Sequence, residues 1–272
     1  MCAPFVLSSV REGLSRRGFL GAAVGCAAVA SVSAQPQPVR LPKGFRDVVD
    51  LTHPFSPALP LYPGYKPVQI RPRFSIAQDG FAANEVTFDE HTGTHVDAPS
   101  HFVAGGASAE RLPVDRLVAP LVVVRIGDRA AKDPDTLVTP NDILEWEKRY
   151  GRIPAGAFVA MHAGWDTRIG DVDRFLNRDP KGTMHAPGFS EESASFLVRE
   201  RDICAVGVDT LSLDAASAQK FVAHVAFLGA GKYGVEMMAN LAAVPPSGAT
   251  VIVGAPAHRG ATGGPARVLA LV

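Results

Sequence analysis

The sequence predicts an α/β or α+β fold in which a mixed sheet is accompanied by few helices. Two runs rich in valine and isoleucine, at residues 121–126 and 203–208, have the length and composition of buried strands. Residues 158–162 are expected to form a further strand, whereas only two segments carry helix start signals. Strands therefore outnumber helices and do not alternate with them regularly, which argues against a continuous βαβ winding.

The two expected helices are recognised by their first residues. A Thr-Pro pair at residues 139–140 suits an N-cap followed by the first helical turn, and Asp142 lies near the positive end of the helix dipole. Gly151 is expected to end this helix. Ser190 is expected to cap a second helix that ends near Arg201.

Further strands are expected near both ends of the folded part of the chain, at residues 48–52, 250–253 and 268–272. In the N-terminal third, Pro72 is expected to break one segment, because proline lacks the N–H that a strand interior needs. Residues 81–88 are expected to form a strand that leads into a histidine-rich stretch.

Length and composition describe a soluble globular protein. The chain has 272 residues, of which 47% are hydrophobic and 20% are charged, and its net charge is zero. It contains no basic block and no interleaving of aromatic and basic residues, so a nucleic-acid partner is not expected.

The N-terminus has the features of an export signal. Residues 1–34 combine Arg16-Arg17, a short apolar run and a Val-Ser-Ala cleavage site, which is typical of a twin-arginine signal peptide. The apolar run is shorter than the ~20 residues of a membrane span, so no stable membrane anchor is expected after processing. Residues 35–46 are expected to be a linker, residues 47–272 the folded domain, and the periplasm the destination.

Cys204 is the only cysteine beyond the expected signal peptide. It cannot form an internal disulfide, and its apolar neighbours favour a small core residue over a reactive thiol.

The stretch from His91 to His101 is the strongest functional signal. It holds three of the eight histidines and an aspartate, and these side chains are common ligands of zinc and related divalent metals. In an extended strand His91 and His95 would lie roughly 13 Å apart, too far to share one ion. The chain must therefore bend, and Gly93 can bend it without steric cost.

The remaining residues of the stretch are consistent with that bend. His95 and Asp97 share one face if the backbone beyond Gly93 is extended. Pro99 keeps the preceding residue out of helical conformation, so His101 can return towards the same point.

The segment HTGTHVDAPSHF at residues 91–102 resembles the signature of the cyclase-like metal-dependent hydrolases, a family that includes bacterial kynurenine formamidase and isatin hydrolase. The resemblance implies a single domain of the α/β class with the swivelling β/β/α fold of kynurenine formamidase. It also implies that His91, His95 and Asp97 bind metal and that His101 is the catalytic acid/base.

The resemblance extends to a second group of residues. It implies that His224 and Glu236 complete a second metal position and that Asp97 bridges two ions. The segments around residues 207–214 and 240–248 also resemble the family. One departure is Met237, which stands where family members often have asparagine, so the substrate or the metal geometry is expected to differ.

These features lead to a functional hypothesis with alternatives. The leading hypothesis is a hydrolase of an amide C–N bond, such as an aryl formamide, that uses one or two divalent ions, zinc or else manganese. One alternative is a cyclic amide or lactone hydrolase, and another is a periplasmic metal- or ligand-binding protein without turnover. The expected partners are a small-molecule substrate and further copies of the chain in a homo-oligomer.

Other polar residues are interpreted as structural. Asp209 and Asp214 are expected to cap backbone groups near strand ends. His162, next to Trp165, is the one histidine outside the cluster expected to line a pocket. The G-x-G-x-x-G match at residues 229–234 lies late in the chain without a helix opening from it, so no dinucleotide site is expected.

Overall fold

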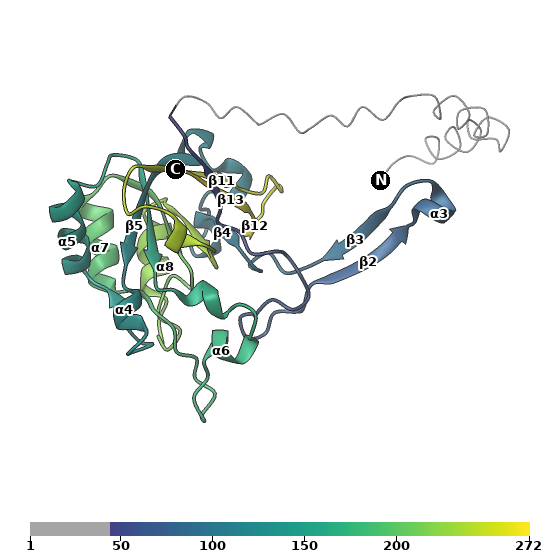
Figure 1. Ribbon diagram of the computed structural model, residues 1–272, viewed down its shortest axis with the longest axis horizontal. Coiled ribbons are helices and arrows are strands. Elements are labelled where there is room, and N and C mark those ends of the chain that lie inside the picture. Colours follow the sequence, from purple (N-terminus) through teal and green to yellow (C-terminus); the bar gives the residue numbers. More distant parts are fainter. Residues whose placement is uncertain (1–43) are drawn as a thin grey trace. The chain divides into compact units, whose positions relative to one another are not determined.

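The computed structural model describes residues 44–272 (Figure 1). The predicted signal peptide and residues 35–43 of the predicted linker lie outside this part. Arg46, the last residue of the predicted linker, already belongs to the fold, because its N–H donates to the carbonyl of Val272 over 2.6 Å.

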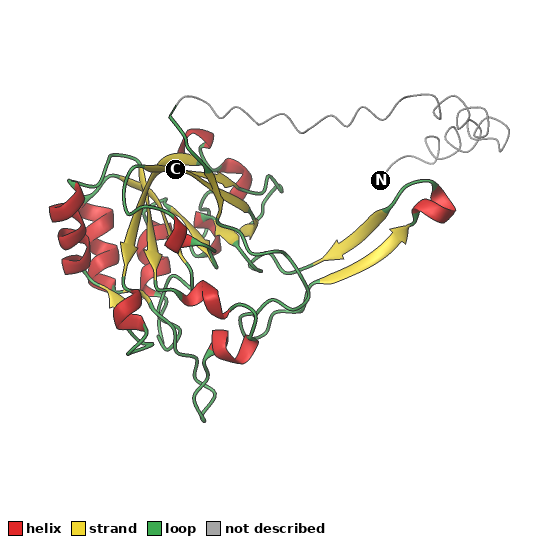
Figure 2. Ribbon diagram, in the orientation of Figure 1, coloured by secondary structure: helices red, strands yellow, loops and turns green. Residues whose placement is uncertain are grey.

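One mixed nine-stranded sheet organises the fold, in the order β1-β13-β11-β5-β7-β9-β10-β4-β12. Strands β5, β7, β9 and β10 are mutually parallel and form its centre, and the remaining pairings are antiparallel. The predicted mixed α/β class is therefore confirmed (Figure 2). The strands are β1 (Val48–Asp50), β4 (His95–Asp97), β5 (Val118–Arg125), β7 (Ala157–His162), β9 (Ile203–Val208), β10 (Tyr233–Glu236), β11 (Ala249–Gly254), β12 (Gly263–Pro265) and β13 (Arg267–Leu271).

The helices begin where their capping residues predict. Thr139 caps α5 (Pro140–Tyr150) in a reciprocal capping box with Asp142, and Gly151 follows its last residue. Ser190 caps α7 (Glu191–Glu200) by accepting from the N–H of Ser193. The other helices are α8 (Val222–Gly229), the short α3 (Ile76–Asp79), α4 (Gly127–Ala130) and α6 (Val172–Leu176), and 3₁₀ turns at Pro99–His101, Ala109–Arg111, Val114–Arg116, Trp165–Arg168 and Leu241–Ala243.

Both faces of the central strands are buried. Alternate residues of β5, β7 and β9, among them Val124, Met161 and Val206, pack beneath the helices with Ile143 and Phe227. Their neighbours in sequence belong to a second cluster on the opposite face, which includes residues of β11 and β13. Cys204 lies in this second cluster, where burial raises the pKa of its thiol to about 11, so it is a core residue as predicted.

A two-stranded hairpin, formed by β2 (Gln69–Phe74) and β3 (Ala83–Thr87), extends away from the main sheet, with α3 at its turn (Figure 1). The expectation that Pro72 breaks this segment is wrong. Pro72 lies inside β2, where the pairing register shifts between Pro72 and Phe74. A proline is tolerated here because a two-stranded hairpin has an outer edge that needs no N–H donor.

Two short parallel strands, β6 (Leu137–Val138) and β8 (Gly188–Phe189), form a separate pair. Across residues 44–272, no helix combines the length and the apolar character that crossing a bilayer requires.

Candidate metal centre

The histidine-rich stretch bends at Gly93 as predicted. Gly93 has a φ of 66°, in the left-handed region that favours glycine, and an added Cβ would lie 2.9 Å from the Leu59 side chain. Beyond the bend, His95–Asp97 form the short strand β4, and Pro99–His101 form a 3₁₀ turn. The backbone thus passes from a left-handed turn through a strand into a helical turn within eleven residues.

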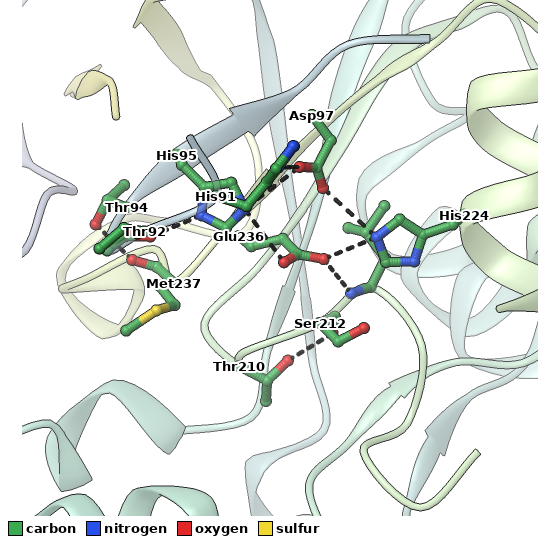
Figure 3. Close-up of polar contacts among 12 residues, drawn as sticks. His91, Thr92, Thr94, His95, Asp97, Thr210, Ser212, His224, Glu236 and Met237 are labelled. Carbon is green, nitrogen blue, oxygen red and sulfur yellow. Dashed lines mark hydrogen bonds and ion pairs between the residues drawn. The ribbon is translucent and has the colours of Figure 1, made fainter. Parts of the chain in front are cut away.

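Sheet pairing brings residues from the C-terminal half to this stretch. β4 lies antiparallel to β10, so that Glu236 is the direct partner of His95 and Gly234 is the partner of Asp97. An added Cβ at Gly234 would lie 2.9 Å from Leu213 and 3.4 Å from Asp97, so glycine keeps space for the aspartate. His224 reaches the same place from α8 (Figure 3).

Four side chains form one cluster, in which His95, Asp97 and Glu236 offer ligand atoms within 4.8 Å of one another. His95 Nε2 lies 3.3 Å from Asp97 Oδ1 and 3.4 Å from Glu236 Oε2. His224 Nε2 lies 3.1 Å from Glu236 Oε1 and 3.5 Å from Asp97 Oδ2. Two donors that each lie about 2.1 Å from one ion, at the tetrahedral angle, are roughly 3.4 Å apart. The separations therefore match a shared divalent ion.

Unpartnered buried atoms support the same interpretation. His95 Nε2 and Asp97 Oδ2 have no hydrogen-bond partner within the described residues, although both are buried. Buried polar atoms are normally satisfied, because leaving them unpaired costs about 1–3 kcal/mol each. A bound cation would satisfy both atoms at once, so the residues present fit a divalent metal ion.

The histidine rings are oriented by their other nitrogens. His95 Nδ1 lies 2.8 Å from the carbonyl oxygen of Gly93, and His224 Nδ1 lies 2.6 Å from Asp214 Oδ2. A proton on each Nδ1 leaves each Nε2 available to a metal. This arrangement assigns Nε2 of both rings to the centre.

His91 lies at the edge of the cluster. Its Nδ1 is 2.6 Å from Asp97 Oδ1, and its Nε2 is 2.9 Å from Thr262 Oγ1. Both ring nitrogens are thus in hydrogen-bond contact, whereas Nε2 of His95 is not. The structure brings His91 to the predicted site as a partner of the Asp97 carboxylate.

The charges in the cluster are strongly interdependent. Burial opposes ionisation, but Asp97 and Glu236 together raise the pKa of His95 to about 10. Burial likewise opposes charge on Asp97, yet His95, His224 and His91 hold its pKa well below its usual value. Positive charge is therefore favoured at the centre, and a metal ion would supply it while displacing the Nε2 protons.

Asp214 has a role in the site that the sequence did not indicate. As predicted, it caps backbone groups by accepting from the N–H groups of Ala223 and His224. In addition, its Oδ2 lies 2.6 Å from Nδ1 of the His224 ring, and Asp214 is 2% exposed. Asp214 therefore fixes both the start of α8 and the direction of the His224 imidazole.

Asp214→Asn is expected to lower the affinity for a divalent metal about 10- to 100-fold, the usual effect of removing a carboxylate that orients a ligating histidine. Metal titration of the purified protein measures this. Asp135→Asn is the matched control, because Asp135 Oδ2 contacts His185 Nδ1 over 2.8 Å outside the site. Equal affinities in the two variants would contradict the orienting role.

His101 approaches the centre without a hydrogen bond to its ring among residues 44–272. Its ring stacks on His91 with centroids 3.8 Å apart and lies 6.1 Å from the His224 ring. Burial is the main reason that its pKa falls to about 4, and His91 and His224 contribute to the decrease. The ring is therefore neutral near pH 7 and has a nitrogen able to accept a proton.

A cavity of about 220 Å³ opens over these residues. His91, His95, His101, His224 and Glu236 form its polar side. Its other side is largely aromatic and is formed by Tyr62, Tyr65, Phe102 and Phe221 with Leu211 and Ser212. A small planar molecule could therefore reach the metal centre between aromatic rings.

Met237, which departs from the family pattern, has a left-handed backbone conformation. Its φ is 52°, a left-handed conformation that asparagine adopts more readily than other non-glycine residues. Its side chain is buried in the core beneath the helices and is not among the residues lining the cavity. Methionine in place of asparagine therefore changes the backbone preference at this position and does not change a side chain that lines the cavity.

The other singled-out residues lie away from the cavity. Asp209 accepts from the N–H groups of Ala163 and Trp165, which is the predicted capping role. His162 lines a different cavity, beside Arg125 and Arg129. The glycine pattern at residues 229–234 spans the end of α8 and the start of β10, so no helix opens from it.

The fold and the site together describe an α/β protein with a buried cluster of histidine and carboxylate ligands. The chain belongs to the cyclase family, because residues 49–215 match the family model described as "Putative cyclase". Isatin hydrolase of Roseibium aggregatum is 35% identical over 250 residues, which cover 86% of this chain and 94% of that protein.

Solved structures agree with this assignment. A crystal structure of an isatin hydrolase bound to the product analogue thioisatinate has a TM-score of 0.78 and 35% identity, covering 83% of this chain and 92% of that one. A predicted metal-dependent hydrolase from Bacillus stearothermophilus has a TM-score of 0.63 and 25% identity, covering 82% of this chain and 97% of that one.

Proposed function

We propose that this chain is a metal-dependent hydrolase that opens the C–N bond of a cyclic amide fused to an aromatic ring, as in isatin. The observation that carries the proposal is the convergence of His95, Asp97, His224 and Glu236 beneath an aromatic-lined cavity, with the neutral His101 beside them. The similarity to isatin hydrolases supports a cyclic amide over an aryl formamide.

Five side chains would hold the metal, His91, His95 and His224 through a ring nitrogen and Asp97 and Glu236 through oxygen. When bound, a divalent ion activates water and polarises a carbonyl as a Lewis acid. Mixed nitrogen and oxygen donors suit zinc, and they also suit manganese. Asp97 presents its oxygens to both His95 and His224, so the carboxylate can be shared between two ions or can serve one.

His101 supplies the proton transfers. In its neutral form it accepts a proton from the attacking water and then donates it to the ring nitrogen, so that the C–N bond breaks and leaves an uncharged amine on the aromatic ring. Because no hydrogen bond to another described residue holds the ring, its nitrogens can be used in both steps. A protein that only bound metal or ligand would need no such neutral histidine.

The aromatic side of the cavity positions the substrate. Phe102 stacks on His224 with centroids 4.7 Å apart, and Phe221 meets Phe102 edge to face at 5.5 Å. These rings form a rigid wall that excludes water and favours a flat aromatic substrate. The carbonyl of such a substrate would then point towards the polar side of the cavity.

A panel of three substrates tests the proposal. The purified protein loaded with manganese or zinc is expected to have its highest kcat/KM on isatin and a lower value on a ring-opened aryl formamide and on an aromatic lactone. A preference for the formamide would support the arylformamidase hypothesis instead. Metal uptake without turnover of any of the three would favour a binding protein.

A further inference from the structure

The ring of His91 lies between two polar partners from different parts of the chain. Its Nδ1 is 2.6 Å from Asp97 Oδ1 on β4 (Figure 3). Its Nε2 is 2.9 Å from Oγ1 of Thr262, the residue directly before β12. Thr262 reaches the ring because β12 pairs with β4. The C-terminal edge of the sheet therefore takes part in the metal centre.

The edge strand leaves a space for the His91 ring. Gly263 is the partner of Asp97 in the pairing of β12 with β4, and a Cβ added to it would lie 2.6 Å from His91 Cε1. The carbonyl of Thr262 accepts from the N–H of Ala98 over 2.9 Å, which holds its backbone beside the histidine-rich stretch. Any side chain at Gly263 would displace the ring, so glycine is needed there.

The hydrogen bonds around Thr262 have one possible direction. Glu90 Oε2 accepts from the N–H of Thr262 over 3.0 Å and from its hydroxyl over 2.6 Å. A carboxylate has no hydrogen to donate, and a threonine hydroxyl has one. Because that hydrogen is directed at Glu90, the Thr262 oxygen can only accept from His91. Nε2 of His91 therefore carries a hydrogen.

This hydrogen leaves Nδ1 of His91 as the nitrogen that faces the centre. A neutral imidazole carries one hydrogen, so its other nitrogen has a free lone pair. Here the lone pair is 2.6 Å from an Asp97 oxygen, and two acceptors in contact repel each other unless they share a cation. His95 and His224 have the opposite arrangement, because their Nδ1 atoms are held and their Nε2 atoms face the centre.

We propose that Glu90 and Thr262 are positioning residues of the metal centre, which keep the hydrogen of His91 on Nε2 and so present Nδ1 as its metal-binding nitrogen. Their role rests on the metal centre of the proposed function. Neither side chain lines the cavity, so both act through His91.

The same ring supports His101. The two imidazoles stack with centroids 3.8 Å apart and planes 25° from parallel. A His91 ring without its contact to Thr262 could rotate and would no longer offer this flat surface. Glu90 and Thr262 therefore also contribute to the position of the residue that transfers protons.

Matched substitutions at Thr262 test the role of its hydroxyl. Thr262→Val keeps the shape of the side chain and removes the hydroxyl, whereas Thr262→Ser keeps the hydroxyl. The affinity for zinc, measured by competition with a chelator, is expected to fall about 10- to 100-fold in Thr262→Val and to remain close to wild type in Thr262→Ser. Thr52→Val is the control, because the Thr52 hydroxyl donates to the Val268 carbonyl outside the cavity.

Substitutions at Glu90 separate the direction of the hydrogen bonds from charge. Glu90→Gln keeps an oxygen that can accept from Thr262 and is expected to keep most of the zinc affinity. Glu90→Ala frees the Thr262 hydroxyl to donate to His91 Nε2, so it is expected to lower the affinity as Thr262→Val does. Glu110→Ala is the control, because Glu110 Oε1 accepts from the N–H of Gly260 in the neighbouring loop.

The hydrogen on the ring is observed directly by long-range ¹H–¹⁵N NMR of the zinc-loaded protein with labelled histidine. The signals of His91 are assigned as those that His91→Gln lacks. We expect the hydrogen on Nε2 in His91 and on Nδ1 in His95 and His224. This measurement does not depend on any activity.

Several results would overturn the positioning role. These are a hydrogen on Nδ1 of His91, a wild-type affinity in Thr262→Val, or equal losses in Thr262→Val and Thr262→Ser. Equal losses in Glu90→Gln and Glu90→Ala would also overturn it, because charge would then set the affinity. Each of these results, with zinc bound by the wild-type protein, leaves the proposed function intact. Wild-type protein that binds no zinc would overturn the proposed function and the positioning role together.

Discussion

Asp97→Ala is expected to lose bound metal and turnover together, with turnover reduced by more than about 100-fold. Changing a residue that only orients a ligand typically costs about 10- to 100-fold, so removing a central carboxylate should cost more. Asp97 is 1% exposed, and its two oxygens face His95 and His224. Glu236 also faces both rings, so Asp97→Ala leaves the cluster with one of its two carboxylates.

Metal analysis of the purified variant, together with isatin hydrolysis, measures both losses. Asp128→Ala, on the exposed surface, is the control for a change of one aspartate. Full metal occupancy in Asp97→Ala would mean that the ion lies elsewhere. Glu236→Ala in the same assay distinguishes the number of ions, because a two-ion site should keep one ion and a one-ion site should lose it.

His101→Ala is expected to keep the metal and lose turnover by about 10²- to 10⁴-fold, the usual contribution of a positioned acid/base. The ring stacks on His91 and makes no hydrogen bond to the four clustered side chains among the described residues, so its removal leaves them in place. Added imidazole should restore part of the rate, because it can enter the space that the ring leaves.

Rescue by imidazole separates proton transfer from a structural role, since a collapsed cavity would not respond to it. His185→Ala is the matched control, because His185 is partly buried, pairs with Asp135 and lies outside the cavity. Loss of metal in His101→Ala would make this histidine a ligand. Unchanged turnover on isatin would exclude it from the reaction.

Local features of the fold could be predicted because they depend on residues that lie close together in the sequence. Thr139 and Ser190 cap helices through contacts three residues away, and Gly93 bends the chain at its own φ. The expectation for Pro72 was wrong because the rule on proline applies to strands with neighbours on both sides.

The second half of the site has no local signature. Glu236 meets His95 only because β10 pairs with β4, and nothing in either segment encodes that pairing across the length of the domain. Its place was inferred from the family resemblance alone. The contact of Asp214 with His224 was missed for a related reason, because an aspartate that caps a helix looks the same in sequence whether or not it also orients a ring.

The most direct test of the central claim is the position of the ion, measured by anomalous scattering from crystals of the protein grown with manganese. We expect a peak within about 2.0–2.2 Å of His95 Nε2 or His224 Nε2, with oxygens of Asp97 and Glu236 at similar distances. A peak on the separate group formed by His162, Asp166 and Asp209, with none at Asp97, would contradict it.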